Sequence, residues 1–212
     1  MTRLSGMLVV MATLTVCGCS KSEPLFNGRD FTGWRVEPGS WAIEPGGAMR
    51  ADEDRIIWTE ERFGDFVLDL DFRFEKGANS GVFLRTGSIE NWLHTAIEVQ
   101  VFDSYGKGKM DSHDCGGIFD CLAPSRNAVK KAGEWNHYTI TCKANKIEVI
   151  LNGVQALDMD LDLWTKPHEN PDGSPNKFNA AYKDMPREGH IGLQGKHGGR
   201  LIWYRDIRIR PL

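Results

Sequence analysis

The chain has 212 residues, and its 26 Lys and Arg against 29 Asp and Glu give a formal net charge of −3 at pH 7. That balance provides no basic field, so the sequence indicates no nucleic-acid partner. Apolar residues make up 41% and charged residues 26% of the chain, which is typical of a soluble globular protein.

The N-terminal segment has the pattern of an export signal. Arg3 is the only charged residue before position 21, and the apolar run over residues 8–16 is too short to cross a bilayer as a helix. The run ends in the letters VCGCS, which resemble the lipobox of bacterial lipoproteins. We therefore predict a lipoprotein signal peptide over residues 1–18, lipidation at Cys19 and a tether over residues 19–24; a plain secretory signal is the alternative. The predicted location is the cell envelope, with a lipid anchor in the membrane.

Three cysteines would remain after processing of the signal: Cys115, Cys121 and Cys142. Export permits disulfides, and Cys115 and Cys121 flank a Gly-Gly pair, so they either form a local bridge or stay free. Cys142 lies in a strand pattern and is expected to be a buried apolar residue.

Alternation of apolar and polar residues dominates the rest of the chain, and no helix of useful length is indicated. The clearest case is DFVLDLDFRFE over residues 65–75, where every second side chain is apolar, as in a half-buried antiparallel strand. Shorter strands are predicted over residues 41–43, 49–51, 56–59, 81–85, 96–102, 117–119, 137–143, 146–151, 155–159, 190–194 and 201–210.

Many short strands at close spacing predict an all-β sandwich of two antiparallel sheets, of the jelly-roll type, over residues 25–212. The long segment over residues 160–189 is rich in Pro, Asn and Lys. A loop of that length is more often functional than idle, and we expect it to fold over one edge of the sandwich.

The strand over residues 96–102 carries the first candidate site. Its Ile and Val side chains alternate toward the core, so Glu98 and Gln100 stand together on the outer face, and Asp103 ends the strand. A carboxylate beside an amide suits sugar hydroxyls, a metal ion or acid–base chemistry, and a solvated outer face is the alternative.

The preceding strand places Arg85 and Phe83 on one face, with Gly81 nearby. We expect Arg85 to lie beside Glu98 across the sheet and to hold its carboxylate ionised; a purely structural ion pair is the alternative. Near the C-terminus, Gln194 alternates with core residues, and His197 follows in a Gly-rich loop, where it could serve as a base or a metal ligand.

A second cluster of polar residues follows the strand that contains Glu98. Asp103, Asp111, His113 and Asp114 could together bind a divalent cation, although their spacing matches no standard loop. The chain has no G-x-S-x-G, P-loop, dinucleotide fingerprint or H-E-x-x-H, so serine hydrolase, nucleotide-binding and zincin functions have no support.

Taken in order, the motifs of this chain resemble the 3-keto-disaccharide hydrolase family, formerly known only as a domain of unknown function. The matching stretches are LFNGRDFTGW (25–34), FVLDLDFRFEKGANSGVFLR (66–85), IEVQVFD (97–103), GEWNHYTI (133–140), LNGV (151–154) and PREGHIGLQGKHGGRLIWYRDIRI (186–209). The resemblance implies a concanavalin- or laminin-G-like jelly roll, in agreement with the alternation.

The resemblance also implies an exported enzyme whose carbohydrate substrate is a 3-keto-glycoside, formed by a separate glycoside 3-dehydrogenase acting upstream. A ketone at C3 makes the C2 proton acidic, so a base can remove it, the C1 substituent can leave by elimination, and water can then add to the enone. A divalent metal ion or an arginine could stabilise the enolate.

Carried over position by position, the resemblance implies functional roles for Arg85, Glu98, Gln100, Gln194 and His197. Glu98 or His197 is expected to be the base, with Arg85 and Gln100 holding the sugar or the enolate. Gln194 is expected to bind substrate.

Asp103 is a further substrate-binding candidate. Two positions depart from the family pattern: Lys196 is an extra residue before His197, and Phe119 stands where a tyrosine is common. A non-catalytic carbohydrate-binding module of the cell envelope is the alternative function, because this type of sandwich often binds glycans without cleaving them.

Overall fold

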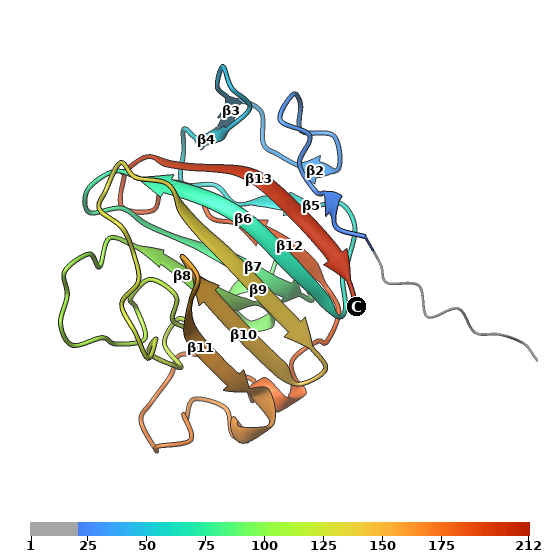
Figure 1. The fold of residues 1–212 in the computed structure, drawn as a ribbon. Helices are drawn as coiled ribbons and strands as arrows, with labels where there is room; N and C mark the ends of the chain where they lie inside the picture. Colours follow the sequence, from blue (N-terminus) through green and yellow to red (C-terminus); the bar gives the residue numbers. More distant parts are fainter. Residues whose placement is uncertain (1–20) are drawn as a thin grey trace, which may run out of the picture.

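The computed structural model describes residues 21–212 of the chain as two antiparallel β-sheets packed face to face (Figure 1). The predicted signal peptide and Cys19 lie outside the described residues. Within the described part, no helix is long and apolar enough to cross a membrane.

The larger sheet has eight strands in the order β11-β10-β9-β6-β13-β4-β3, with β1 added on β13. Its strands are β1 (Glu23–Pro24), β3 (Trp41–Ile43), β4 (Met49–Ala51), β6 (Phe66–Phe74), β9 (Asn136–Lys143), β10 (Lys146–Leu151), β11 (Val154–Asp160) and β13 (Ile202–Pro211).

The smaller sheet has five strands in the order β2-β5-β12-β7-β8. They are β2 (Trp34–Arg35), β5 (Ile57–Thr59), β7 (Asn79–Thr86), β8 (Ile97–Phe102) and β12 (His190–Leu193). Every strand pair in both sheets is antiparallel. The all-β jelly-roll prediction is therefore confirmed.

The core lies between the two sheets and follows the predicted alternation. The inward-pointing apolar side chains of β6 are completely buried, and so are Val99 and Val101 of β8, which point away from Glu98. The fully enclosed residues of these two strands are Phe66, Leu68, Leu70, Phe72 and Phe74 from β6, with Val99 and Val101 from β8. One shift of register along β8 would turn Glu98 into the core, so this apolar pattern fixes which face carries the site.

One predicted strand, over residues 117–119, does not form as such. Ile118 makes only isolated bridges, to Val99 and to Leu122, because the chain turns at once through Asp120, whose φ is +62°. The segment still lies along the free edge of β8: Phe119 donates its N–H to the carbonyl of Glu98 at 3.0 Å, and Gln100 donates to Gly117 at 2.9 Å. This short segment therefore borders the candidate site.

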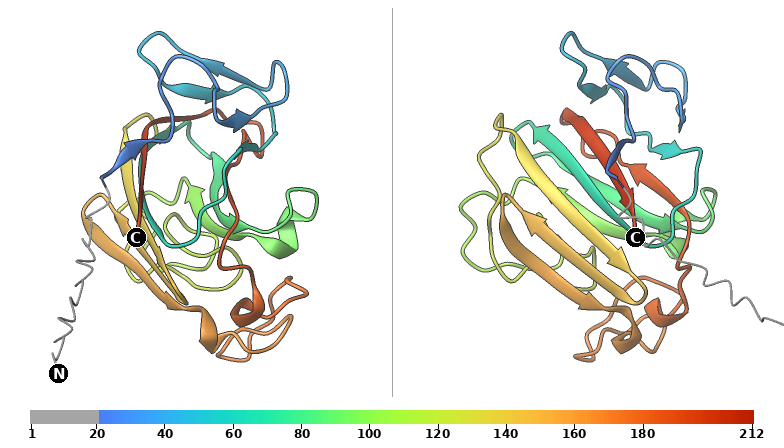
Figure 2. Two further views of the ribbon diagram at one scale, coloured as in Figure 1. Left: turned by 90° about the vertical axis from the view of Figure 1, so that its right-hand side faces the viewer. Right: turned by 45° about the vertical axis from the view of Figure 1, so that its right-hand side comes forward.

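The long segment after β11 covers one end of the sandwich, as predicted. It contains two short 3₁₀ turns, η1 (Leu161–Leu163) and η2 (Tyr182–Asp184), and Figure 2 shows it at the opposite end from the N-terminal strands. The helix α1 (Trp92–Thr95) lies beside the outer side of the five-stranded sheet, and His94 accepts a hydrogen bond from Asn179 of the long segment at 3.4 Å. The α1 helix and the long segment after β11 therefore border the outer face of the five-stranded sheet.

The three cysteines of the described residues are free thiols and all are buried. Cys115 and Cys121 therefore do not form the local bridge that the sequence left open. Burial raises the pKa of the Cys115 thiol to about 11 and that of the Cys121 thiol to about 12. Neither thiol is ionised near neutral pH, so neither serves as a nucleophile.

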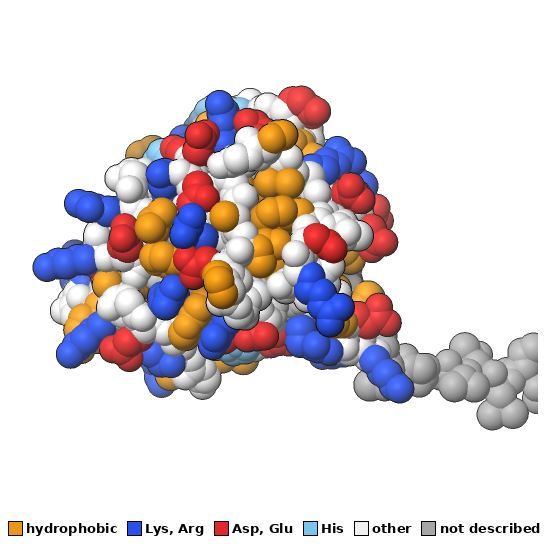
Figure 3. Space-filling model, turned by 90° about the horizontal axis from the view of Figure 1, so that it is seen from above, with side chains coloured by type: hydrophobic (Ala, Val, Ile, Leu, Met, Phe, Trp, Pro, Cys, Tyr) orange, Lys and Arg blue, Asp and Glu red, His pale blue; other side chains and the backbone are white. Residues whose placement is uncertain are grey.

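Charged side chains of both signs are interspersed on the face of the molecule seen in Figure 3, with apolar side chains between them. That face has no field of one sign, in keeping with the near balance of charges in the sequence.

Candidate active site

The outer face of the five-stranded sheet gathers the polar residues that the sequence singled out. Strand pairing puts Trp58, Gly192, Phe83 and Glu98 in one row across β5, β12, β7 and β8. A second row beside it contains Gln194, Gly81 and Gln100, since Gln194 donates to the carbonyl of Gly81 at 2.9 Å and Gly81 pairs with Gln100. Glu98, Gln100 and Gln194 therefore share one face, as predicted.

Glu98 is seated by a glycine on the neighbouring strand. A β-carbon built on Gly81 would overlap the carboxyl group of Glu98, so the carboxyl group occupies the space that any other residue at position 81 would fill. The φ of Gly81 is not positive, so the glycine serves the close approach of the side chain rather than a turn. Gly81 thus fixes where the carboxyl group lies.

Burial gives Glu98 unusual acid–base properties. The residue is only 7% exposed, and no side chain or backbone group of residues 21–212 donates a hydrogen bond to its carboxyl group. Desolvation raises the pKa of Glu98 to about 8, and the charge of Lys177 opposes part of that rise. A carboxyl group that titrates close to neutral pH is suited to general base catalysis.

Lys177 comes from the long segment after β11, and sequence analysis missed it. Its ammonium group lies 4.1 Å from the ring centroid of Phe119, the residue that is hydrogen-bonded to the backbone of Glu98. The side chain is exposed and has no salt bridge within residues 21–212. Only the unusual length of the segment hinted that it contributes to the site.

An aromatic group lies beside Glu98 on the same face. Phe83, directly opposite Glu98 on β7, packs at 5.5 Å from Trp58 and at 5.0 Å from Trp92 of the α1 helix. Gly192 leaves room for the indole of Trp58, because a β-carbon there would overlap that ring. The group provides the apolar surroundings that raise the pKa of Glu98, and its partly exposed member, Trp92, has a flat ring of the kind that sugars pack on.

The two glutamines add hydrogen-bonding groups to this face. Gln100 is 2% exposed, and its side-chain oxygen has no hydrogen-bond partner in the described residues. A buried acceptor without a partner is costly, unless a bound ligand supplies the missing donor. Gln194 lies across Gly81 from it and is also buried. Sugar hydroxyls fit both amides because they can donate and accept.

Arg85 does not lie beside Glu98, contrary to expectation. Its φ is +49°, and its completely buried guanidinium donates to the carbonyls of Gly64 and Ala144 and to the carboxylate of Asp65, at 2.7–2.8 Å. These partners belong to the turns that precede β6 and join β9 to β10. Arg85 therefore ties these two turns to the end of β7, and its ion pair with Asp65 is the structural one that was the alternative. Sequence alternation failed because the backbone leaves the extended conformation at this residue.

The role of Arg85 predicts a loss of stability rather than of chemistry. Arg85→Ala leaves two carbonyls and part of a carboxylate without their donor, so we expect the free energy of unfolding to fall by about 3–5 kcal/mol. Urea denaturation measures this change. Asp65→Asn is the matched control and should cost less, since the Asp65 side chain is 38% exposed and keeps an acceptor. A wild-type unfolding curve for Arg85→Ala would contradict the assignment.

His197 and Asp103 lie at the margin of the site. The His197 ring pairs with Asp54 at 2.9 Å, and its side chain is 52% exposed. Its backbone bridges to Asn79 at the start of β7. Asp103 accepts a hydrogen bond from the backbone of Gly77 at 2.8 Å, which holds the β6–β7 turn. Within the described residues neither side chain contacts Glu98.

The predicted cation site does not fit a metal ion. Lys107 places its ammonium between Asp111 and Asp114, at 2.7 Å from each carboxylate, so a cation already neutralises these two residues. Asp103 is engaged with Gly77, and His113 lies 3.7 Å from Asp120. No cluster of three His, Cys, Asp or Glu side chains suited to a metal ion is found among residues 21–212.

These features define a jelly-roll protein with a buried carboxyl group on the outer face of its smaller sheet. Residues 21–210 match the model of the 3-keto-alpha-glucoside-1,2-lyase-like domain. The chain belongs to this family, as its sequence motifs indicated.

Individual relatives agree with this assignment. The chain is 26% identical to the 3-keto-disaccharide hydrolase of Bacteroides thetaiotaomicron, over 89% of this chain and 77% of the relative. A solved structure of a candidate glycosyl hydrolase from Parabacteroides distasonis is 40% identical, with a TM-score of 0.85 over 91% of this chain and 100% of that one. A Bacillus subtilis protein of unknown function with a galectin-like fold shares the fold alone, at 16% identity and a TM-score of 0.58, over 91% of this chain and 96% of that one.

Proposed function

We propose that this protein cleaves 3-keto-glycosides, with Glu98 as the base that removes the proton at C2. The observation that carries the proposal is the desolvated carboxyl group of Glu98, which has a pKa of about 8 and no hydrogen-bond donor among the described residues. A base of this strength can be ionised near neutral pH and is basic enough to take a carbon-bound proton that a neighbouring ketone has acidified.

The reaction that we propose has three steps. Glu98 takes the C2 proton, and the electron pair of the broken bond forms an enolate with the C3 ketone. The enolate then expels the C1 substituent, which leaves as an alcohol after taking up a proton, and a C1–C2 double bond forms. Water adds its oxygen to C1 and a proton returns to C2, so one water is consumed and the net result is hydrolysis.

Glu98 is preferred over His197 as the base. His197 is half exposed and paired with Asp54, so nothing in its surroundings withdraws it from water. Glu98 faces Phe83 and Gly81 in a desolvated position, where a carboxylate is a far stronger base than in water.

The remaining groups of the face suit binding and charge stabilisation. The side-chain amides of Gln100 and Gln194 can hydrogen-bond sugar hydroxyls, and the ammonium of Lys177 can oppose the charge that develops on the enolate oxygen. Trp92, the partly exposed ring of the aromatic group, can offer one face of the sugar an apolar surface.

Incubation with a 3-keto-disaccharide, followed by chromatography of the released sugars, tests the proposal. We expect release from the 3-keto-disaccharide and none from the unoxidised parent, because only the ketone acidifies C2. Tight binding of unoxidised glycans without turnover of the oxidised ones would contradict the proposal and favour a binding module.

Lys177 offers a prediction about pH dependence. The ammonium stabilises the ionised form of Glu98, so Lys177→Met raises the pKa of Glu98 further and moves the rise of kcat/KM toward alkaline pH. Each unit of pKa lowers the ionised fraction at pH 7 about tenfold. Lys177→Arg keeps the charge and should keep the profile. An unchanged profile in Lys177→Met would show that this ammonium does not act on the base.

In this proposal the protein is exported to the cell envelope and anchored by a lipid at Cys19. Its substrate requires an upstream glycoside 3-dehydrogenase, since the ketone must be present before cleavage. We expect metabolically labelled palmitate to enter the wild-type protein and not Cys19→Ser. Equal labelling of the two would contradict the anchor.

A further inference from the structure

A short turn at the free edge of β8, residues 118–121, contributes no group to the proposed reaction but is bonded to the base. Phe119 donates its N–H to the carbonyl of Glu98 at 3.0 Å, and Cys121 donates to the carbonyl of Ile118 at 3.0 Å. The positive φ of Asp120, +62°, lets the chain reverse within these four residues. The side chains of the turn therefore keep a fixed place relative to Glu98.

Asp120 ties the long segment after β11 to this turn. Lys177 donates its backbone N–H to Oδ2 of Asp120 at 2.8 Å, and the side-chain amide of Asn170 donates to the backbone carbonyl of Asp120 at 3.1 Å. Two hydrogen bonds from the irregular segment thus converge on one residue at the border of the candidate active site. They fix the backbone from which the Lys177 side chain starts.

Buried amides brace the same part of the long segment. The side-chain oxygen of Asn170, a residue only 7% exposed, accepts the indole N–H of Trp164 and an amide N–H of Asn176, each at 2.9 Å. Asn176 directly precedes Lys177 and is also buried. Hydrogen bonds between buried polar groups are costly to break, so the segment presents Lys177 from a rigid backbone.

Phe119 holds the other end of the Lys177 side chain. The ammonium lies 4.1 Å from the centroid of the Phe119 ring. That ring packs against the core and, edge to face, against the ring of His113 at 5.1 Å, so it offers the ammonium a fixed aromatic face. A cation over the face of an aromatic ring is attracted to it. The exposed Lys177 side chain therefore has a preferred place although it forms no salt bridge in residues 21–212.

We propose that Phe119 and Asp120 are positioning residues, which together hold the ammonium of Lys177 beside Glu98. Asp120 fixes the backbone at Lys177, Phe119 fixes the end of its side chain, and the N–H of Phe119 ties both to the strand that carries the base. The inference rests on the proposed function for its catalytic meaning, because Lys177 is the charge that opposes the enolate. Both residues act through Lys177, and neither needs to contact the substrate.

The surroundings of Glu98 allow its titration to report on the place of Lys177. Lys177 is the one charged group of the described residues that acts on the Glu98 carboxyl group. Tyr182 and Tyr204 lie close enough to be affected by the charge of Glu98, but burial raises the pKa of both phenols above their ordinary value, so both stay neutral where Glu98 titrates. Displacement of the Lys177 ammonium should therefore shift the titration of Glu98 to alkaline pH.

The test follows the carboxyl carbon of Glu98 by isotope-edited NMR in the whole protein, with Glu98→Gln to assign the signal. Phe119→Leu removes the aromatic face but keeps apolar bulk, so it should move the titration of Glu98 to alkaline pH, as Lys177→Met does. Phe119→Tyr keeps the ring and should leave the titration in place. Phe119→Leu combined with Lys177→Met should shift it no further than Lys177→Met alone, since the ammonium is already absent.

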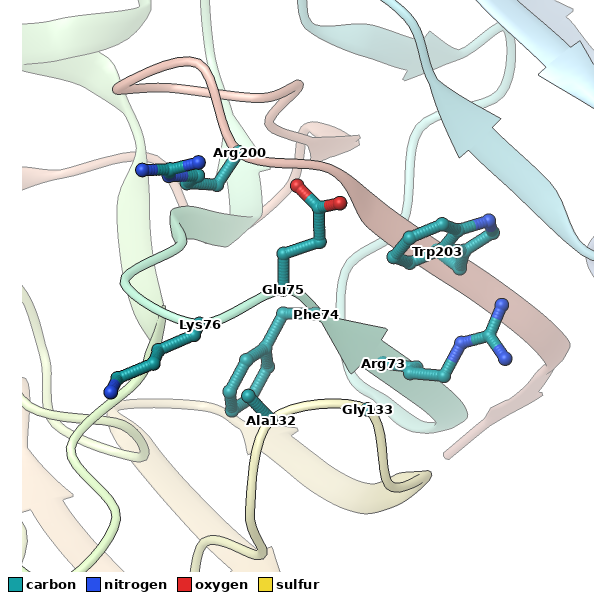
Figure 4. A pocket seen from close by; sticks show the side chains of 8 residues that line it. All are labelled: Arg73, Phe74, Glu75, Lys76, Ala132, Gly133, Arg200 and Trp203. Carbon is teal, nitrogen blue, oxygen red and sulfur yellow. The ribbon is translucent and has the colours of Figure 1, made fainter.

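Asp120 provides a second, independent pair of variants. Asp120→Asn keeps an acceptor for the N–H of Lys177 and tolerates a positive φ, whereas Asp120→Ala keeps neither. We expect only Asp120→Ala to move the titration of Glu98. Lys76→Met is the control for the loss of a lysine, because Lys76 is exposed, has no salt bridge in the described residues and points away from Glu75 in Figure 4. It should leave the titration unchanged.

Kinetics on a 3-keto-disaccharide give a second readout. Phe119→Leu should lower kcat/KM at pH 7 about two- to fivefold, which corresponds to one exposed cation–π contact, and Phe119→Tyr should not. An unmoved Glu98 titration in Phe119→Leu, an equal shift in Phe119→Tyr, or a further shift in the double variant would overturn the proposal.

Two further outcomes are distinguishable. If Phe119→Leu did not fold, the Asp120 pair would decide, and equal titrations in Asp120→Ala and Asp120→Asn would overturn the proposal. A protein that cleaves no 3-keto-disaccharide would contradict the proposed function, whereas the NMR titration, which needs no substrate, would still test the positioning of Lys177.

Discussion

Glu98→Gln should reduce kcat/KM on a 3-keto-disaccharide by about 10²- to 10⁴-fold, which is the usual contribution of general base catalysis. The amide has nearly the same shape as the carboxyl group and fits the space above Gly81, but it cannot accept the C2 proton. Steady-state kinetics at pH 8, near the pKa of the wild-type group, measures the loss. Glu98→Asp is the matched control and should retain part of the activity, because it keeps an ionisable group.

The same substitution should stabilise the protein at alkaline pH. The pKa of Glu98 is about 8 in the folded protein and 4.5 as a free group, a difference of 3.5 units. Below pH 4.5 the group is neutral in both states and contributes nothing. Above pH 4.5 the unfolded chain releases the proton while the folded one retains it, so the folded state loses stability up to about pH 8, by about 5 kcal/mol at most.

Thermal unfolding at pH 4.5 and pH 9 tests this sign. The Tm of Glu98→Gln should exceed that of the wild type at pH 9 and match it at pH 4.5. A difference that does not change with pH would mean that Glu98 is not held in a desolvated state. Glu98 would then support activity at the expense of stability, a trade-off that is typical of catalytic residues.

Gly81→Ala should impair catalysis while it leaves the fold largely intact. The added methyl group needs the space that the Glu98 carboxyl group occupies, and the end of a flexible side chain can move more easily than the sheet. Displacement of a reacting group by about 1 Å costs about 10²-fold in rate. Kinetics together with an unfolding curve close to that of the wild type would support this reading.

Gly192→Ala is the matched control on the same face, because there the added methyl group meets the indole of Trp58 instead of Glu98. We expect it to raise KM through the displaced indole and to preserve the pH dependence set by Glu98. If Gly81→Ala retained full activity, Glu98 would not need its present position, and the proposed mechanism would lose its geometric basis.

Sequence patterns predicted the framework well, because alternation reports directly on burial. The period-two pattern of β6 and β8 placed their apolar residues in the core and Glu98 with Gln100 on the outer face, and the structure agrees. Gln194 lies on the same face, because the alternation of β12 continues one residue beyond the end of the strand, where the Gln194 N–H donates to the carbonyl of Gly81. Successive side chains of a regular strand point to opposite faces of the sheet, so the face on which each of these residues lies could be predicted from the sequence.

The sequence was less informative where the backbone leaves the regular strand. Arg85 has a positive φ at the end of β7, so the alternation of positions wrongly predicted Glu98 as its partner, whereas its side chain pairs with Asp65. Lys177 reaches the site from an irregular segment, in which no periodic pattern of apolar residues indicates where a side chain points. The space that Gly81 leaves for Glu98 is a cross-strand relation, which no local pattern encodes.

The central claim is that Glu98 removes the proton at C2, and deuterium at that carbon tests it most directly. A 3-keto-disaccharide deuterated at C2 should be cleaved by the wild type more slowly than its protiated form, with kcat/KM rising as Glu98 ionises around pH 8. In Glu98→Gln, both cleavage and loss of the C2 deuterium to water should be slowed by the same factor of about 10² to 10⁴. Equal rates for the two substrates in the wild type, with Glu98→Gln as active as the wild type, would contradict the account.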